Sequence, residues 1–362
     1  MLGPMPARDR ALAVLVAVVW GLNFPAIHLS LQQFPPLFLV ALRFTLLAVP
    51  TLLLVPRPSA PWRWVLAYGA GFGVLQFVFL YVAMDSGMPT GLASLVLQSS
   101  APFTVVLAAA LLRERVSARQ AAGVGVAALG LGGIALHRAG LGGGATLLPV
   151  VLTLCGGLGW ALGNLGNRQA MRAAPGEPFR LLLWMSVVPP LPMLAASLVV
   201  EGPDRITASF GDLTSRQGLL AVAGLAFTVL VATLLGGGIW TTLMGRHPSS
   251  TVAPFSMLVP VVGIASSWLL LRERTATAEL VWGAVVVAGV LLGSTRAVPS
   301  WWPRRRARGT RGQAGTATTS AVATAATPSP RPVSPSPSVV VADTDTGAPA
   351  AADSAASASA RR

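Results

Sequence analysis

Aromatic and amide side chains recur together inside the apolar stretches of this sequence. Trp20 and Asn23 are three residues apart, and Trp160 and Asn164 are four apart, so each pair shares one face of a helix. Amide groups donate and accept hydrogen bonds, and indole faces attract cations. Such pairs suit a small zwitterion, whose ammonium meets amide oxygens and aromatic faces while its carboxylate accepts from amide N–H groups.

Other polar side chains interrupt further apolar stretches. Arg43 is a fixed cation inside one of them, so it needs a partner or an aqueous pocket; it could hold a carboxylate, gate access or snorkel to the interface. For the amides, an interhelical hydrogen bond is an open alternative to substrate binding. The candidate substrate-binding residues are Trp20, Asn23, Arg43, Gln76, Gln98, Trp160, Asn164 and Trp240.

Catalytic and cofactor motifs are missing from the sequence. Cys155 is the single cysteine, and the three histidines, His28, His137 and His247, fall on separate segments without ligand spacing. No HExxH, GxSxG or GxxxxGK[ST] pattern occurs. The sequence therefore predicts neither an enzyme nor a metal or cofactor site.

The composition predicts a membrane protein. Hydrophobic residues make up 53% of the chain and charged residues 10%, which leaves too little polar surface for a water-soluble domain of this length. Most apolar stretches reach the ~20 residues that a membrane-spanning helix needs. They run over residues 11–33, 37–55, 64–84, 88–112, 120–136, 146–167, 181–200, 217–244, 249–271 and 280–295.

A five-residue motif appears twice and indicates an internal duplication. Leu111–Arg115 reads LLRER and returns unchanged as Leu270–Arg274, near the end of an apolar stretch in each half. Five helices per copy is an odd number, so the second copy enters the membrane from the opposite side. We expect an all-α membrane protein of ten helices in two inverted five-helix repeats, an architecture typical of transporters. The expected divisions are a cytoplasmic N-terminus (1–10), two repeats (11–137 and 146–296) and a disordered, basic, proline-rich cytoplasmic tail (297–362).

The arginines favour a cytoplasmic position for both termini, because cytoplasmic loops carry the excess of basic residues. Under that topology the inner loops hold Arg8, Arg10, Arg57, Arg63, Arg113, Arg115, Arg119, Arg168, Arg172, Arg180 and Arg246. The outer loops hold only Arg138, Arg205, Arg216, Arg272 and Arg274. The net charge of +14 thus fits anionic lipid headgroups, not nucleic acid.

Short motifs along both halves resemble the EamA-type transporters of the drug/metabolite superfamily. They include Trp20–Phe24 (WGLNF), Gly91–Gln98 (GLASLVLQ), Leu258–Gly263 (LVPVVG) and the two LLRER motifs. The resemblance covers residues 11 to 296 and is nearest to bacterial exporters of O-acetylserine and cysteine. It implies secondary export of small amino-acid-like metabolites across the inner membrane by alternating access, with protons as the default coupling ion. Asp85 and the long tail depart from that pattern.

Several alternatives stay open at this stage. The same fold serves uptake as well as export, and it serves other metabolites or drugs. The competing classes are an intramembrane enzyme and a non-transporting scaffold. An enzyme should show a nucleophile, an acid or a metal cluster in the spans, where Asp85 and Arg43 are nearly the only ionisable groups, and a scaffold has no need of matched Trp/Asn pairs in both halves. The expected partners are a small-molecule substrate, membrane lipids and protons, and the sequence is compatible with a homodimer.

Overall fold

The computed structural model describes residues 5–142, 144–247 and 249–294. Within these ranges every regular element is a helix, and ten helical segments are long and apolar enough to cross a bilayer. The predicted all-α membrane fold with ten spans is therefore confirmed. The predicted disordered tail, residues 297–362, lies outside the described residues.

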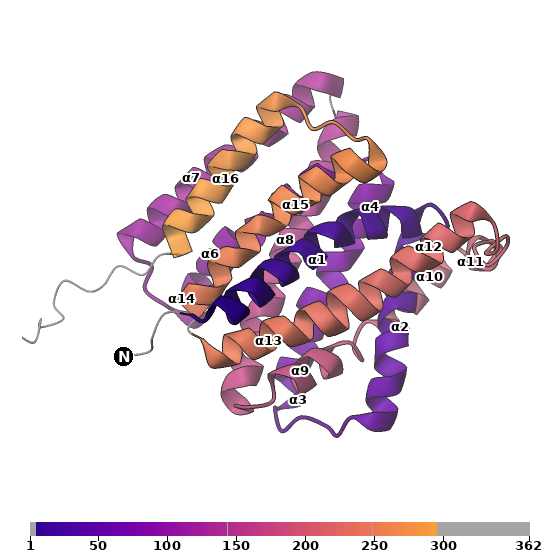
Figure 1. The fold of residues 1–362 in the computed structure, drawn as a ribbon, viewed down its shortest axis with the longest axis horizontal. Coiled ribbons are helices and arrows are strands. Elements are labelled where there is room, and N and C mark those ends of the chain that lie inside the picture. The colour runs from indigo at the N-terminus through magenta and orange to yellow at the C-terminus, as the bar shows by residue number, and fades with distance from the viewer. Residues whose placement is uncertain (1–4, 143, 248, 295–362) are drawn as a thin grey trace, which may run out of the picture. The chain divides into compact units, whose positions relative to one another are not determined.

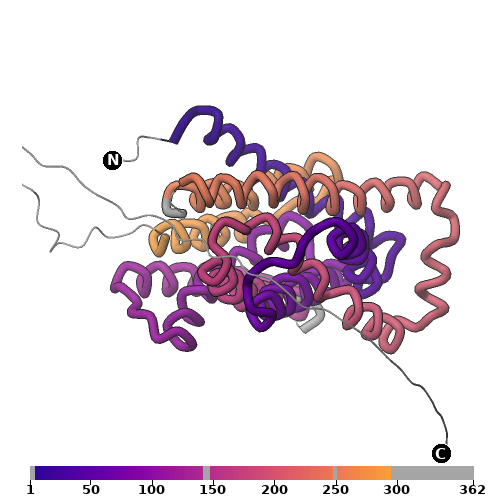
Figure 2. The backbone as a smooth tube through the Cα atoms, turned by 90° about the horizontal axis from the view of Figure 1, so that it is seen from below, coloured from indigo at the N-terminus to yellow at the C-terminus, as the bar shows by residue number. Residues whose placement is uncertain are grey.

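The ten spans are numbered in chain order, and Figure 1 labels most of their helices. Spans 1 to 5 are α1 (Ala7–Leu31); α2 (Pro36–Leu54); α3, η1 and α4 (Trp62–Tyr68, Gly69–Leu75, Gln76–Asp85); α5, η2 and α6 (Thr90–Val96, Leu97–Ser99, Ser100–Leu112); and α7 (Ala118–Gly142). Spans 6 to 10 are α8 (Gly144–Ala173); α9 and α10 (Pro178–Met185, Pro190–Val200); α12, η3 and α13 (Arg216–Ala226, Phe227–Gly236, Gly237–Arg246); α14, η4, α15 and η5 (Ser249–Val252, Ala253–Met257, Leu258–Ser266, Ser267–Leu271); and α16 (Thr277–Ser294). Spans 7 and 8 are joined through α11 (Pro203–Ala208), which runs across one end of the bundle at the right of Figure 2.

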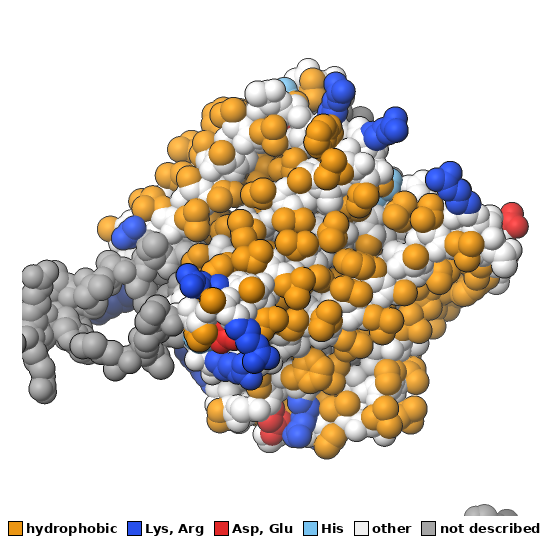
Figure 3. Space-filling model, viewed as in Figure 1, with side chains coloured by type: hydrophobic (Ala, Val, Ile, Leu, Met, Phe, Trp, Pro, Cys, Tyr) orange, Lys and Arg blue, Asp and Glu red, His pale blue; other side chains and the backbone are white. Residues whose placement is uncertain are grey.

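The outer surface of the helical bundle is apolar. Leu53, Leu54 and Val199 are 76%, 79% and 85% exposed, values that lipid tails tolerate and water does not. In Figure 3 hydrophobic side chains cover the face in view, and the charged side chains lie toward its edges. This distribution fits a membrane protein whose outer surface contacts the hydrocarbon core of the bilayer.

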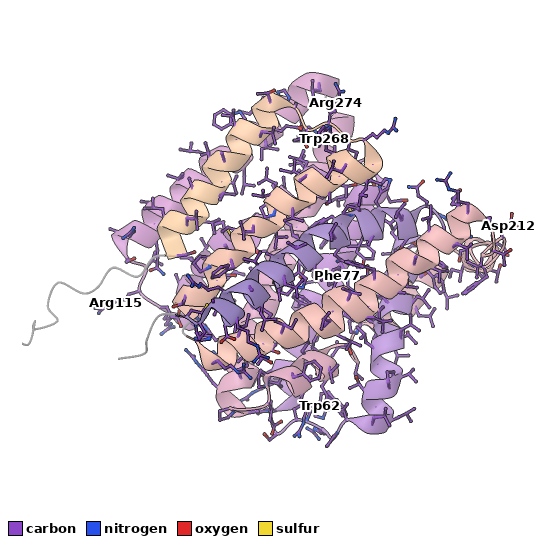
Figure 4. The ribbon with its side chains drawn as sticks, in the orientation of Figure 1. Trp62, Phe77, Arg115, Asp212, Trp268 and Arg274 are labelled. Atoms are coloured by element: carbon purple, nitrogen blue, oxygen red, sulfur yellow. The ribbon has the colours of Figure 1, made fainter. Side chains whose placement is uncertain are left out.

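The two LLRER motifs end their helices in the same conformation. Arg113 and Arg272 both adopt the left-handed region, with φ of 52° and 57°. The next residue in each copy then donates its N–H six residues back, Glu114 to Ala108 O and Glu273 to Ser267 O, both at 3.3 Å, as in a Schellman motif. Figure 4 places Arg115 and Arg274 toward opposite ends of the bundle. The duplicated motif therefore ends two equivalent helices that run in opposite directions, as an inverted repeat requires.

Both repeats interrupt their helices at equivalent places. Spans 3 and 8 contain the π-helical segments η1 and η3, and spans 4 and 9 contain the 3₁₀ segments η2 and η4. π-helical turns inside α-helices are rare and occur frequently at functional sites. In span 8 the hydroxyl of Thr233 donates to Thr228 O, five residues back, at 2.8 Å. The irregular turns thus position polar side chains within the membrane region.

Glycines bring several spans into backbone contact. A Cβ added at Gly71 of span 3 would lie 2.7 Å from the Cα of Gly163 in span 6, and one added at Gly21 of span 1 would meet the Val262 side chain of span 9. Small residues allow such approaches between membrane helices. Spans 5 and 10 pair in the same way through Gly123 and Gly293, and α7 and α16 lie side by side in Figure 1. Glycine contacts thereby hold span 3 against span 6 and span 1 against span 9.

Candidate functional site

A cavity of about 120 Å³ lies among eight of the ten spans. One water needs ~10–15 Å³ on this measure, so the space suits a small metabolite. The first repeat contributes Trp20, Asn23, Phe24, Ile27, Arg43, Phe72, Gln76, Phe77, Leu80, Ser94, Leu97 and Gln98. The second contributes Trp160, Leu182, Ala232, Thr233, Gly237, Ser256 and Val259. Spans 1 to 4 and 6 to 9 therefore build the wall together, and six of the eight predicted site residues belong to it.

Arg43 is the charged group of this wall. It is 4% exposed, its Nη1 donates to the Tyr81 hydroxyl at 3.0 Å and its Nη2 donates to the Thr233 hydroxyl at 2.9 Å. Its guanidinium carbon lies 3.9 Å from the ring centroid of Phe77, which Figure 4 labels in the middle of the bundle. Both hydrogen-bond partners are uncharged. Within the described residues, none of the ion pairs includes Arg43.

Span 1 presents Trp20 and Asn23 to the cavity from positions fixed by span 8. The Trp20 indole Nε1 donates to Ala232 O at 3.0 Å, and the Thr228 hydroxyl donates to Asn23 Oδ1 at 2.8 Å. A buried indole N–H normally needs such a partner. These two contacts join the first helix of repeat one to the irregular helix of repeat two.

The two glutamines differ in how much of their hydrogen-bonding capacity the protein uses. Gln98 donates from Nε2 to Ser256 O at 3.3 Å, across spans 4 and 9. Gln76 is 4% exposed, and its Oε1 has no hydrogen-bond partner within the described residues. A buried acceptor without a partner carries a desolvation cost of about 1–3 kcal/mol. Gln76 therefore brings a buried, unused acceptor to the wall of the cavity.

Trp160 continues an aromatic wall that the sequence analysis missed. Its ring centroid lies 6.1 Å from that of Phe72, which in turn lies 5.7 Å from that of Phe77. Phe77 also packs on Tyr81, at 5.6 Å between centroids. The signal was present as aromatic residues at helical spacing along span 3, but such residues are ordinary in an apolar helix.

Two predicted site residues lie away from the cavity lining. Asn164 donates to the Thr104 hydroxyl of α6 at 3.3 Å, so it links spans 6 and 4. Trp240 packs against Trp20, with ring centroids 5.1 Å apart and the ring planes tilted by 51°. Asp85, which departs from the family pattern, is exposed at the end of α4.

A buried cation, amides and aromatic rings, enclosed by helices of both repeats, form the kind of site that secondary transporters build within their spans. Fold and cavity together thus define the class, a multi-pass membrane transporter built from an inverted repeat. The chain belongs to the EamA-like transporter family, whose model matches residues 10–136 and 147–295, once in each half.

Curated relatives and a solved structure extend over most of the chain. A probable amino-acid metabolite efflux pump of Salmonella typhimurium is 41% identical over 290 residues, which cover 80% of this chain and 95% of the relative. One of the same description from Escherichia coli K12 is 39% identical over 290 residues, with the same coverage. A crystal structure of a protein 19% identical shares the fold, with a TM-score of 0.52 over 80% of this chain and 96% of that one. These relatives point to a transporter and not to an enzyme.

Proposed function

We propose that this protein exports small amino-acid-like metabolites, of the cysteine and O-acetylserine type, across the inner membrane by alternating access. The observation that carries the proposal is the match to two amino-acid metabolite efflux pumps at 41% and 39% identity, over 95% of each relative. The cavity supports it with a cation, amides and aromatic rings in a space for a small ligand. Both termini are cytoplasmic, the proton gradient supplies the energy, and the protein works as a monomer or a homodimer. Uptake, or export of another small metabolite or drug, is the alternative.

Transport of labelled cysteine, O-acetylserine and a panel of amino acids into inside-out vesicles tests the substrate and the direction. ATP-independent accumulation of an amino acid that collapses with the proton gradient would support the proposal. Accumulation of unrelated drugs alone, or accumulation only in right-side-out vesicles, would favour the alternative.

Alternating access is supported by a carboxylate contact that joins spans 4 and 9. At one end of the bundle, Thr90 donates to the Glu273 carboxylate from its backbone N at 2.8 Å and from its hydroxyl at 2.9 Å. At the next residue, Gly91, an added Cβ would lie 3.1 Å from the Cα of Ile264 in span 9. The Glu273 ends of spans 4 and 9 are therefore closed on each other.

The duplicated sequence implies the matching contact at the other end. Thr90 lies 24 residues before Glu114, and Ser249 lies 24 residues before Glu273. Both Thr90 and Ser249 directly follow a proline. Glu114 instead binds Arg168 here, with Nη2 at 2.8 Å and Nη1 at 3.2 Å from its oxygens. By the inversion, the alternate state has Glu114 bound to the start of span 9 while Glu273 has released Thr90.

The amides of the wall give a direct test of the site. Asn23→Ala and Gln98→Ala are each expected to reduce apparent substrate affinity about 5- to 100-fold, since a buried partner left unpaired costs about 1–3 kcal/mol. Asn164→Ala is the matched comparison, because Asn164 bonds to Thr104 outside the cavity lining. The measurement is concentration-dependent uptake into inside-out vesicles at equal membrane abundance. If only Asn164→Ala loses transport, Asn164 binds the substrate as the sequence predicts, and the substrate does not bind in the cavity described above.

Topology is tested with single cysteines in a Cys155→Ala background. Ser117 and Ala276 are exposed positions that follow the first and second LLRER motifs. Ser117→Cys is expected to react with an impermeant thiol reagent from the cytoplasmic side, and Ala276→Cys from the exterior. Labelling of both from one side would exclude the proposed orientation of the repeats.

A further inference from the structure

The buried guanidinium of Arg43 keeps most of its donors free of protein partners. A guanidinium has five N–H groups, and within the described residues Arg43 gives one to Tyr81 and one to Thr233. Its Nε is buried without a partner. Neither Asp nor Glu occurs among the described residues of the cavity wall. A buried charge without a counter-charge is costly, so this position favours an anion.

Three of the four candidate amides each bind the protein through one of their two polar groups. Asn23 accepts from Thr228, Asn164 donates to Thr104, and Gln98 donates to Ser256 O. Gln76, in contrast, has a buried oxygen with no partner within the described residues. It lines the same cavity as Arg43. The wall thus combines uncommitted N–H donors on one residue with an uncommitted acceptor on another.

We propose that Arg43 binds the carboxylate of the transported molecule and that Gln76, with the faces of Trp20 and Trp160, binds its ammonium group. The planar guanidinium matches a carboxylate with paired N–H donors, and indole faces attract ammonium ions. This assignment rests on the proposed function, because it names the ligand class of the same cavity. It makes the free carboxylate the group that is recognised, so the ester and the decarboxylated amine of the same molecule are expected to bind more weakly.

Two residues hold the guanidinium and act as positioning residues. Tyr81 comes from span 3 of the first repeat and Thr233 from span 8 of the second. Arg43 therefore spans the interface between the repeats. A carboxylate bound there contacts a group whose position depends on both halves of the transporter.

The test compares four compounds that differ only at the two charged groups: L-cysteine, L-cysteine methyl ester, cysteamine and 3-mercaptopropionate. Binding to the purified full-length protein is followed by ligand-induced thermal stabilisation, and transport by counterflow in liposomes. The wild-type protein is expected to bind L-cysteine best and 3-mercaptopropionate next, and to discriminate against the ester and cysteamine by about 10- to 100-fold, the range for a hydrogen-bonded charged group.

The variants separate the two halves of the proposal. Arg43→Met is expected to weaken L-cysteine and 3-mercaptopropionate about 10- to 100-fold and to leave the ester unchanged. Gln76→Leu is expected to weaken L-cysteine and cysteamine and to leave 3-mercaptopropionate unchanged. Thr233→Val and Tyr81→Phe keep the guanidinium, so they retain the acid-over-ester preference at reduced affinity, and they replace Arg43→Met if that variant does not fold.

The outcomes distinguish failure of the site assignment from failure of the proposed function. Equal weakening of L-cysteine and its ester by Arg43→Met would overturn the carboxylate assignment and leave the export of amino-acid-like molecules in place. Binding of 3-mercaptopropionate without L-cysteine would support the assignment of Arg43 and overturn both that of Gln76 and the proposed substrate class. Binding of the ester as tightly as the acid by the wild-type protein would overturn the role of Arg43 outright.

Discussion

Replacement of Gly71 by leucine is expected to prevent folding, so that little folded protein accumulates in the membrane. A Cβ at Gly71 would lie 2.7 Å from Gly163 Cα and 2.9 Å from Gly159 O. These are backbone atoms, so no rotamer change relieves the clash, and spans 3 and 6 would have to separate. Overpacking of a core already costs about 1–3 kcal/mol when side chains can shift, and the cost is higher where two backbones meet. Membrane abundance and elution of a fluorescent fusion on size exclusion measure the effect.

The chain offers matched controls for this substitution. Gly163→Leu is expected to fail in the same way, because its Cβ would lie 2.9 Å from Phe72 Cα. Gly125→Leu should accumulate normally, since nothing lies within 4 Å of a Cβ at that exposed position of span 5. Normal abundance of Gly71→Leu would show that spans 3 and 6 do not meet at Gly71.

The number and type of the spans could be predicted from hydropathy because the bilayer sets both length and polarity. The LLRER duplication predicted the inverted repeat because five helices per copy reverse the second one. Neither argument depends on which helices touch. The pairing of spans 3 with 6 and 1 with 9 depends on glycine contacts that join distant parts of the sequence, and hydropathy carries no such information.

The candidate site was partly predictable for a related reason. Arg43, Gln76 and Gln98 stand out because polar groups in hydrocarbon must face something other than lipid. Trp240 shows the limit of the method. It lies three residues after Gly237 in the same helix α13, and Gly237 lines the cavity. Helical spacing therefore gives the correct face, but it cannot show that the Trp240 ring packs against Trp20 outside the lining.

Asn164 shows a second limit, which concerns the neighbouring helix. Helical spacing correctly puts it one turn from Trp160, yet its side chain reaches Thr104 of span 4. The sequence gives no measure of how close span 4 passes at that height. The sequence did not single out Phe72 and Phe77, because aromatic residues are common in apolar helices. Their role in the cavity wall becomes visible only when the neighbouring helices are known.

Loss of the Glu273 carboxylate is expected to shift the transporter toward the state that opens at the Glu273 end. In Glu273→Ala, the backbone N and hydroxyl of Thr90 lose the acceptor that caps span 4. Loss of a helix N-cap costs about 0.5–2 kcal/mol, and 1–2 kcal/mol changes a two-state ratio roughly 5- to 30-fold. A cavity cysteine, Ser256→Cys with Cys155→Ala, reports the shift. Its labelling by an impermeant reagent should rise by that factor from the Glu273 side and fall from the other.

A second carboxylate at the same end supplies the control, and the repeat supplies the opposing variant. Glu201 caps span 2 at the same end, accepting from Leu37 N at 2.7 Å and Phe38 N at 2.9 Å, so Glu201→Ala removes the same kind of contact without touching spans 4 and 9. It is expected to leave the side preference of labelling unchanged. Glu114→Ala should move labelling opposite to Glu273→Ala, because by the inversion it weakens the alternate closure, while the exposed ion pair with Arg168 that it removes here contributes little. Equal shifts for Glu273→Ala and Glu201→Ala would show that the contact between Glu273 and Thr90 is an ordinary helix cap and does not control opening. A shift in the same direction for Glu114→Ala and Glu273→Ala would exclude the exchange of the two carboxylates between states.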